Sequence, residues 1–245
     1  MQPLWQTMNV STKRVVLGVI LGPLAIVWIG RWSGSVVTGD LYAAALLLFC
    51  LWPLIPFGIV GNQWPQRLWA RSLGLYLASV LMGRAATEFL GFNPQANVLS
   101  HWSWSLARGL LWQFPIAIPV ENLLLVVFVV GCRKLFGPSR MAASVFPALA
   151  FGLLHVPFWG AWAWFSVGAS VLPWTIYMVF SGDLWAPVIA HLVLDMTAVF
   201  ALVPLLLKSP YGPWLAAIGL WGLAGLAMAV LRQFGRSRRA YPPWA

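Results

Sequence analysis

Acidic residues are scarce in this sequence. Asp and Glu together account for 5 of its 245 residues, and none occurs between Glu121 and Asp183 or after Asp195. Only 8% of the residues are charged, whereas 61% are hydrophobic, and the mean hydropathy is +0.82. In soluble globular domains, roughly a quarter of the residues are charged. The composition therefore excludes a typical soluble domain and indicates a protein whose main solvent is lipid.

Cysteine is also rare, and segments that alternate between apolar and polar residues are missing. Cys50 and Cys132 lie in or beside apolar runs, so we expect free thiols and no disulfide framework. A transmembrane β-barrel would show many short alternating segments, which this sequence does not have. We therefore expect an all-α fold.

Long apolar runs are abundant and predict about eight transmembrane helices. A helix needs roughly 20 apolar residues to cross the hydrocarbon layer, because each residue advances about 1.5 Å. The expected spans are residues 15–32, 40–60, 68–90, 104–132, 142–158, 164–181, 185–207 and 212–231. We interpret residues 1–245 as a single membrane domain with a short basic tail at 232–245.

Proline and glycine predict breaks inside two of the apolar stretches. Pro115 and Pro119 fall in the fourth expected span, which is too long for one upright crossing. They favour an interfacial stretch that leads into a kinked span. Gly160 and Pro173 are the candidate breaks in the uncharged stretch that follows Arg140.

The formal net charge of +10 does not indicate a nucleic-acid-binding protein, because the basic residues lie between apolar runs and form no stripe. Basic residues favour the cytoplasmic side of a membrane. With both termini in the cytoplasm, the inner side receives Lys13, Arg14, Arg67, Arg71, Arg133, Lys134, Arg140, Arg232, Arg236, Arg238 and Arg239, and the outer side Arg31, Arg108 and Lys208. The short tails and the strong charge bias favour a bacterial inner membrane, and an endoplasmic-reticulum membrane fits the same pattern. We expect membrane lipid to contact the basic tail.

Four ionisable residues lie well inside expected spans: Glu121, His155, His191 and Asp195. Such a residue costs a few kcal/mol or more at membrane depth unless it is paired or hydrated. His191 and Asp195 are four residues apart and share one helix face. We expect the four side chains to converge in one buried, wet pocket.

Several kinds of site use these residues. A buried carboxylate is a suitable general base, and a neighbouring imidazole polarises water or stabilises an oxyanion. The same four residues are also possible Zn²⁺ ligands, or a proton relay in a transporter. The structural alternative is that the histidines only bond neighbouring helices. Arg84 and Glu88, four residues apart, are interpreted as a self-satisfying pair near the outer interface.

Three sequence strings resemble a known family. They are PVENLLLVVFVVGCRKLFG from Pro119, FGLLHVP from Phe151 and SGDLWAPVIAHLVLD from Ser181. Order and spacing resemble the CPBP family of intramembrane proteases, related to the type II CAAX prenyl endopeptidases and the lysostaphin-resistance-like proteins. That family shows EExxxR, FxxxH and HxxxN on successive transmembrane helices, and the resemblance covers about residues 115–205.

The first and third motifs depart from the family pattern. Glu121 matches the leading glutamate, but Asn122 replaces the second and Val126 stands in place of the arginine. Asp195 occupies the position usually held by asparagine. A carboxylate there donates to an oxyanion only when protonated, so Asp195 is expected to orient His191, to stay neutral or to favour a metal. Arg84 is the hypothetical substitute for the missing arginine.

The resemblance implies an intramembrane endopeptidase that cleaves a membrane-anchored or lipidated substrate. In that reading Glu121 and His155 activate water, while His191 and Asp195 bind the oxyanion or support the site. The degenerate first motif leaves a second hypothesis, a catalytically silent relative that acts as a membrane scaffold or in immunity. A proton-coupled transporter is a third, but the sequence shows no internal repeat.

Overall fold

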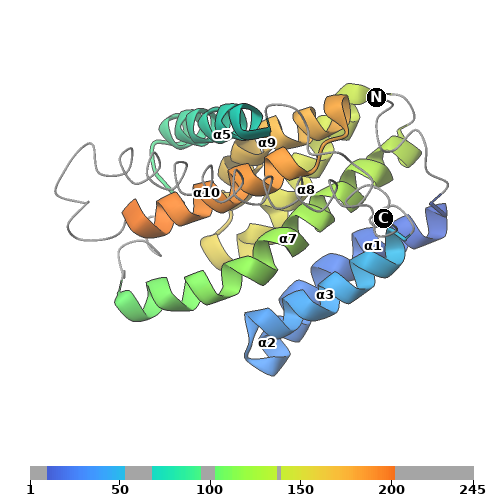
Figure 1. Ribbon diagram of the computed structural model, residues 1–245, viewed down its shortest axis with the longest axis horizontal. Helices are drawn as coiled ribbons and strands as arrows, with labels where there is room; N and C mark the ends of the chain where they lie inside the picture. Colours follow the sequence, from blue (N-terminus) through green and yellow to red (C-terminus); the bar gives the residue numbers. More distant parts are fainter. Residues whose placement is uncertain (1–9, 53–67, 95–102, 137–138, 202–245) are drawn as a thin grey trace, which may run out of the picture. The chain divides into compact units, whose positions relative to one another are not determined.

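A computed structural model of the chain describes residues 10–52, 68–94, 103–136 and 139–201 (Figure 1). All regular secondary structure in these ranges is helical, which confirms the predicted all-α class. The helices are α1 (Thr12–Leu24), η2 (Ala25–Ile29, a π-helical stretch), α2 (Gly30–Ser33), α3 (Val36–Cys50), α5 (Leu68–Leu90), α7 (Trp104–Leu135), α8 (Arg140–Trp159), α9 (Ala163–Ser181) and α10 (Trp185–Ala201).

Five helical stretches among the described residues are long and apolar enough to cross a membrane. They are Thr12–Ser33, Leu68–Leu90, Trp112–Leu135, Arg140–Trp159 and Ala163–Ser181. The shorter apolar helices α3 and α10 begin the second and seventh expected spans. The protein is therefore an integral membrane protein built as a helical bundle.

Most helix ends lie within a few residues of the expected ones, and two features differ more clearly. Helix α3 begins at Val36 and ends at Cys50, whereas the expected span was 40–60; residues 53–60, like the whole expected span 212–231, lie outside the described residues. The predicted break at Pro173 is wrong, because this proline lies inside α9. Transmembrane helices tolerate proline where neighbouring helices and local adjustments satisfy the freed backbone carbonyl.

Helix ends follow local sequence signals. Gly160 ends α8 with a φ of 88°, which confirms the predicted break, and Gly182 ends α9 with a φ of 72°. These left-handed conformations favour glycine because it has no Cβ. Ser139 caps α8 by accepting from the backbone N–H of Ala142, and Asp183 accepts from the N–H of Trp185 at 2.9 Å as α10 begins.

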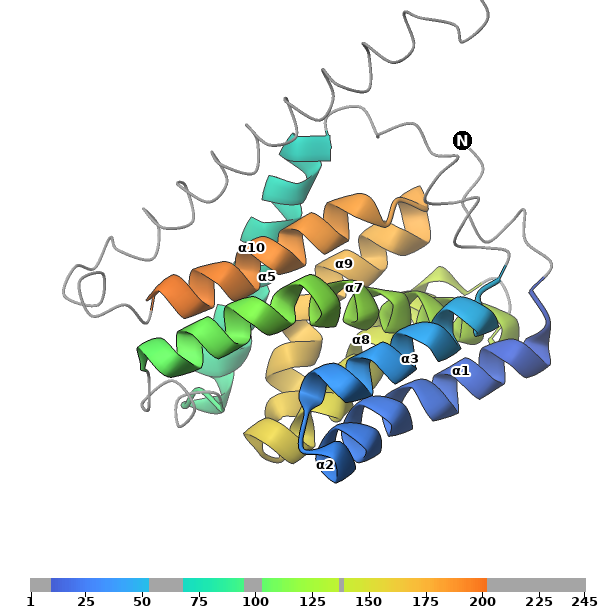
Figure 2. The same ribbon diagram turned by 60° about the horizontal axis from the view of Figure 1, so that its bottom comes forward.

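The chain divides into two compact units, Met1–Leu192 and Val193–Ala245. Within the first unit, α1 and α3 pack against each other and against α7, α7 packs against α8, α8 against α9, and α9 against α5. Figure 2 shows α1 and α3 side by side, next to α7. Helix α7 runs unbroken through Pro115 and Pro119. The single-domain interpretation of residues 1–245 stays a prediction.

Helices α8 and α9 approach each other most closely where both carry small residues. A Cβ atom added at Gly152 would collide with the backbone carbonyl of Trp164, and one at Gly168 would lie 3.2 Å from the carbonyl oxygen of Ala148. Small residues are typical of such contacts between membrane helices, because they let the two backbones meet. This contact fixes α8, the helix that carries His155, firmly against α9.

Candidate functional site

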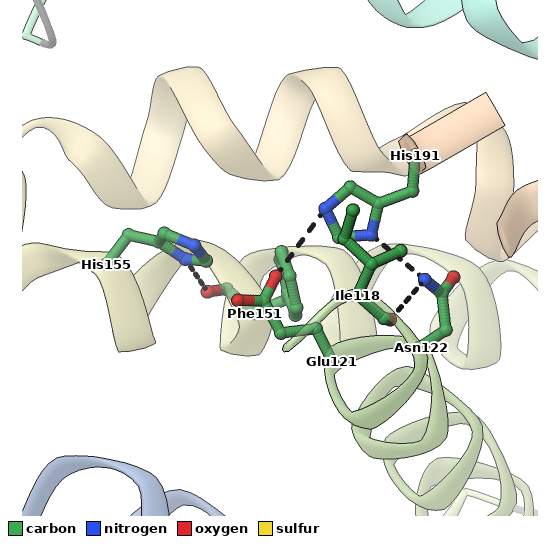
Figure 3. Close-up of polar contacts among 6 residues, drawn as sticks. All are labelled: Ile118, Glu121, Asn122, Phe151, His155 and His191. Carbon is green, nitrogen blue, oxygen red and sulfur yellow. Dashed lines mark hydrogen bonds and ion pairs between the residues drawn. The ribbon is translucent and has the colours of Figure 1, made fainter. Parts of the chain in front are cut away.

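Helices α7 and α10 bring a carboxylate and an imidazole together. The Oε2 atom of Glu121 lies 3.5 Å from Nε2 of His191 (Figure 3). His191 belongs to the part of α10 that lies in the first unit. The sequence places the two residues 70 positions apart, so this contact is a product of tertiary structure.

Asn122, the residue next to Glu121, contacts the other side of the same imidazole. Its amide nitrogen Nδ2 lies 2.9 Å from Nδ1 of His191 and donates to the carbonyl oxygen of Ile118 at 2.8 Å. Two consecutive residues of α7 therefore bracket the His191 ring, one at each ring nitrogen. A ring held at both nitrogens keeps its orientation.

His155 joins this cluster from α8 through Phe151. Its Nδ1 lies 2.9 Å from the carbonyl oxygen of Phe151, one helical turn earlier. The ring of Phe151 lies 4.8 Å from the His155 ring and 6.2 Å from the His191 ring, measured between centroids. Figure 3 shows the Glu121 carboxyl group on the side of α7 that faces both imidazoles.

The tautomer of neutral His155 follows from its partner. A carbonyl oxygen only accepts, so Nδ1 of His155 carries the proton and donates to Phe151. The other ring nitrogen, Nε2, is then an acceptor. His155 is therefore suited to receive a hydrogen bond from water, a hydroxyl or an amide.

Burial is graded across the site. His191 is 4% exposed, and its ring lies tilted against that of Trp174, itself 1% exposed, with the ring centroids 4.7 Å apart. The Glu121 side chain is 27% exposed, and His155 is half-buried. The inner wall of the site is thus closed by aromatic rings, while its carboxylate remains accessible. Polar interactions on such a wall are stronger than in water, because the surrounding dielectric constant is low.

The residues present do not fit a metal site. Among the described residues, no group of three or more His, Cys, Asp or Glu side chains is arranged to hold a metal ion. Nδ1 of His191 also faces the Asn122 amide, which disfavours the Nδ1-protonated tautomer that a ring bound to a metal through Nε2 requires. Zn²⁺ therefore has no step in the mechanism proposed for these residues.

The structure brings three of the four predicted site residues into one region, namely Glu121, His155 and His191. Asp195 lies one turn beyond His191 on α10, in the second unit, and its place relative to Glu121 stays a prediction. Arg84 instead forms an ion pair with Glu88, and its side chain is 76% exposed. The expected self-satisfying pair is confirmed, and nothing places Arg84 beside Glu121.

Sequence reasoning missed three contributors to the site. Asn122 was noted only as a departure from the glutamate motif, and Trp174 was not singled out. Asp183, to which no role was assigned, accepts from the Tyr177 hydroxyl at 2.7 Å as well as from the N–H of Trp185. Its place two residues before the start of α10 is a capping signal that could have been recognised. It fixes the start of the helix that carries His191.

One comparison with known proteins bears on these residues. The family model described as "Type II CAAX prenyl endopeptidase Rce1-like" matches residues 102–197, a segment that contains Glu121, His155 and His191. No curated protein and no solved structure matches the chain. The match covers less than half of the chain and agrees with the resemblance that the three motifs carry.

Proposed function

We propose that this chain belongs to the CAAX-type protease family and is an intramembrane endopeptidase that uses Glu121 as its general base. The observation that supports the proposal is the accessible Glu121 carboxylate, 3.5 Å from the buried His191 ring, in a region that Phe151 links to His155. A carboxylate with one imidazole 3.5 Å away and a second imidazole in the same region is a combination of groups suited to activate water.

Water would bind between two acceptors, the Glu121 carboxylate and Nε2 of His155. Each acceptor takes one hydrogen bond, so the lone pairs of the water oxygen face the substrate. Glu121 removes a proton as the oxygen attacks the peptide carbonyl carbon. The resulting tetrahedral intermediate collapses, the C–N bond breaks, and the leaving amine takes the proton from Glu121.

His191 would stabilise the negative charge that develops on the carbonyl oxygen. A preorganised N–H donor that is shielded from water stabilises an oxyanion better than water does, because it need not reorient during the reaction. Its present partner is Glu121. In the substrate complex, the Nε2–H group of His191 would keep its proton and turn its hydrogen bond from Glu121 to the substrate oxygen.

The substrate class follows from the location of the site and from the family. Glu121 and His155 lie inside helices long and apolar enough to cross a membrane. We propose a membrane-anchored or lipidated peptide, and the family name favours a prenylated one. The excess of basic residues on one side of the expected topology supports an orientation with both termini in the cytoplasm, which reporter proteins fused to each end would test. A bacterial inner membrane is the proposed location.

The experiment compares two single-atom changes of the same type. Purified wild-type protein, Glu121→Gln and Glu88→Gln are reconstituted in liposomes with a library of membrane-anchored peptides, prenylated and unmodified, and cleavage is followed by mass spectrometry. We expect Glu121→Gln to lower the rate by about 10²–10⁴-fold, the usual contribution of a general base. Glu88→Gln should cleave normally, because Glu88 is 64% exposed and its ion-pair partner is Arg84.

Equal cleavage by wild-type protein and Glu121→Gln would refute the role of Glu121. Loss of activity in Glu88→Gln as well would indicate a general effect on folding. If wild-type protein cleaved no peptide of either kind, the proposal of an active protease would lose to the hypothesis of a silent scaffold. A chelator is included in parallel reactions and should leave the wild-type rate unchanged.

A further inference from the structure

We propose that Asn122 fixes the proton of His191 on Nε2. His191 is therefore a hydrogen-bond donor to the site and not a metal ligand. Asn122 is in this view a positioning residue, since it acts on the substrate only through His191. The inference deepens the proposed function and rests on it only for its effect on cleavage. The tautomer itself is a property of the folded protein.

The argument begins at the carbonyl oxygen of Ile118. Only a donor is stable 2.8 Å from this oxygen, so the atom of Asn122 that lies there is the amide nitrogen. The opposite orientation of the amide would place two oxygens against each other. The Ile118 carbonyl therefore determines which end of the Asn122 amide is the NH₂ group.

The same NH₂ group lies 2.9 Å from Nδ1 of His191. An amide NH₂ has two hydrogens and accepts none, so one hydrogen serves Ile118 and the other serves the imidazole. Nδ1 of His191 must accept, and in the neutral ring the proton is then on Nε2. This is the nitrogen 3.5 Å from the Glu121 carboxylate, which is itself an acceptor.

The alternative tautomer has no stable arrangement in this pocket. A proton on Nδ1 would face the Asn122 NH₂ group, donor against donor, at a site where Asn122 is 3% and His191 is 4% exposed. Water has little access to relieve that conflict. Binding a metal through Nε2 would require this tautomer, so the Asn122 contact disfavours His191 as a ligand.

The two histidines of the site consequently have opposite roles. His155 donates from Nδ1 to Phe151 and offers an acceptor at Nε2, whereas His191 accepts at Nδ1 and offers a donor at Nε2. One ring is suited to hold water and the other to hold the substrate oxygen. A carboxylate in place of Asn122 would reverse the second assignment, because it would accept a proton from Nδ1.

The test reads the tautomer directly by nitrogen NMR. The chain has three histidines, His101, His155 and His191, so protein labelled with ¹⁵N-histidine in liposomes gives few signals, and those of His191 are identified by their loss in His191→Gln. We expect the wild-type ring to be protonated at Nε2 only. In Asn122→Asp, Nδ1 should become protonated, while the His155 signals stay in place and show that the fold is intact.

A second variant and an added metal complete the experiment. Asn122→Leu has a similar shape but no donor, and should give a mixture of both tautomers. Equimolar Zn²⁺ should leave the wild-type His191 signals unmoved. A wild-type ring protonated at Nδ1, an unchanged tautomer in Asn122→Asp, or a Zn²⁺-induced shift of the Nε2 signal would each overturn the proposal.

Cleavage assays separate this inference from the proposed function. Losing an oxyanion donor costs about 10²–10³-fold in kcat, so we expect a loss of that order in Asn122→Asp, with KM little changed. If cleavage proceeds in a wild-type protein whose His191 carries the Nδ1 proton, the tautomer inference is wrong and the protease survives. If the tautomers are as expected but no peptide is cleaved, the tautomer inference stands and the proposed protease activity is wrong.

Discussion

The helices around His191 and the helices at the beginning of the chain are joined in different ways. Around His191, side-chain hydrogen bonds between helices add to the close α8–α9 packing at Gly152 and Gly168. Examples are Asn122 to His191 and the Thr175 hydroxyl to the carbonyl oxygen of Ser144 at 2.7 Å. In the α1–α3 layer, backbones meet directly at glycines. A Cβ atom added at Gly39 would lie 2.8 Å from the carbonyl oxygen of Ile26 and 2.9 Å from the amide nitrogen of Gly30.

Both kinds of helix contact are formed in lipid. Lipid gives helices no hydrophobic reason to associate, so contact comes from close packing or from polar bonds. Close packing holds backbones but positions no chemical group. Hydrogen bonds contribute little net stability, yet they fix the orientation of individual side chains, which a catalytic site requires. Changes in the α1–α3 layer should therefore alter stability, and changes at the site should alter activity.

The largest effect on stability is expected for Gly39→Ala. The added methyl group meets backbone atoms that cannot move away independently, and overpacking of this kind costs about 1–3 kcal/mol. We expect a lower thermal midpoint in detergent and normal cleavage per folded molecule. Gly74→Ala on α5 is the matched control, because nothing lies within 4 Å of its added Cβ. Equal midpoints for both variants would contradict the close-packing explanation.

A smaller effect is expected for Thr175→Val, which removes a hydroxyl while keeping the shape of the side chain. Thr175 is fully buried and bonds α9 to α8. Hydrogen bonds between membrane helices average about 0.6 kcal/mol and reach about 1.7. The thermal midpoint should fall by less than in Gly39→Ala. A larger fall than in Gly39→Ala would show that hydrogen bonds, and not close packing, dominate the stability of this protein.

The smallest effect, and one of opposite sign, is expected for Asp40→Asn. Asp40 is 2% exposed in α3, and its Oδ2 has no hydrogen-bond partner among the described residues. Replacing a buried carboxylate by a neutral amide reduces the cost of burial. We expect the midpoint to stay the same or to rise, by less than about 1 kcal/mol of stability. A marked loss of stability or of cleavage would reveal a function for Asp40 that packing does not explain.

Much of the fold was predictable because its signals are local. Runs of apolar residues predict helices that cross lipid, and Gly160 predicts the end of α8. Pro173 misled the prediction, since a proline that would break a helix in water is accommodated in a packed membrane helix. The candidate site was recognisable from Glu121, His155 and His191, because an ionisable residue at membrane depth is costly unless it is paired or functional.

The sequence by itself determined that the protein crosses a membrane as helices, and which ionisable residues lie at membrane depth. Only the tertiary structure decided that Asn122 bonds His191, that Phe151 lies against both imidazoles, and that Asp40 is buried. Local patterns fix where a helix begins, ends and becomes apolar. Which side chains meet depends on the rotation and crossing of whole helices, and these follow from packing over their full length.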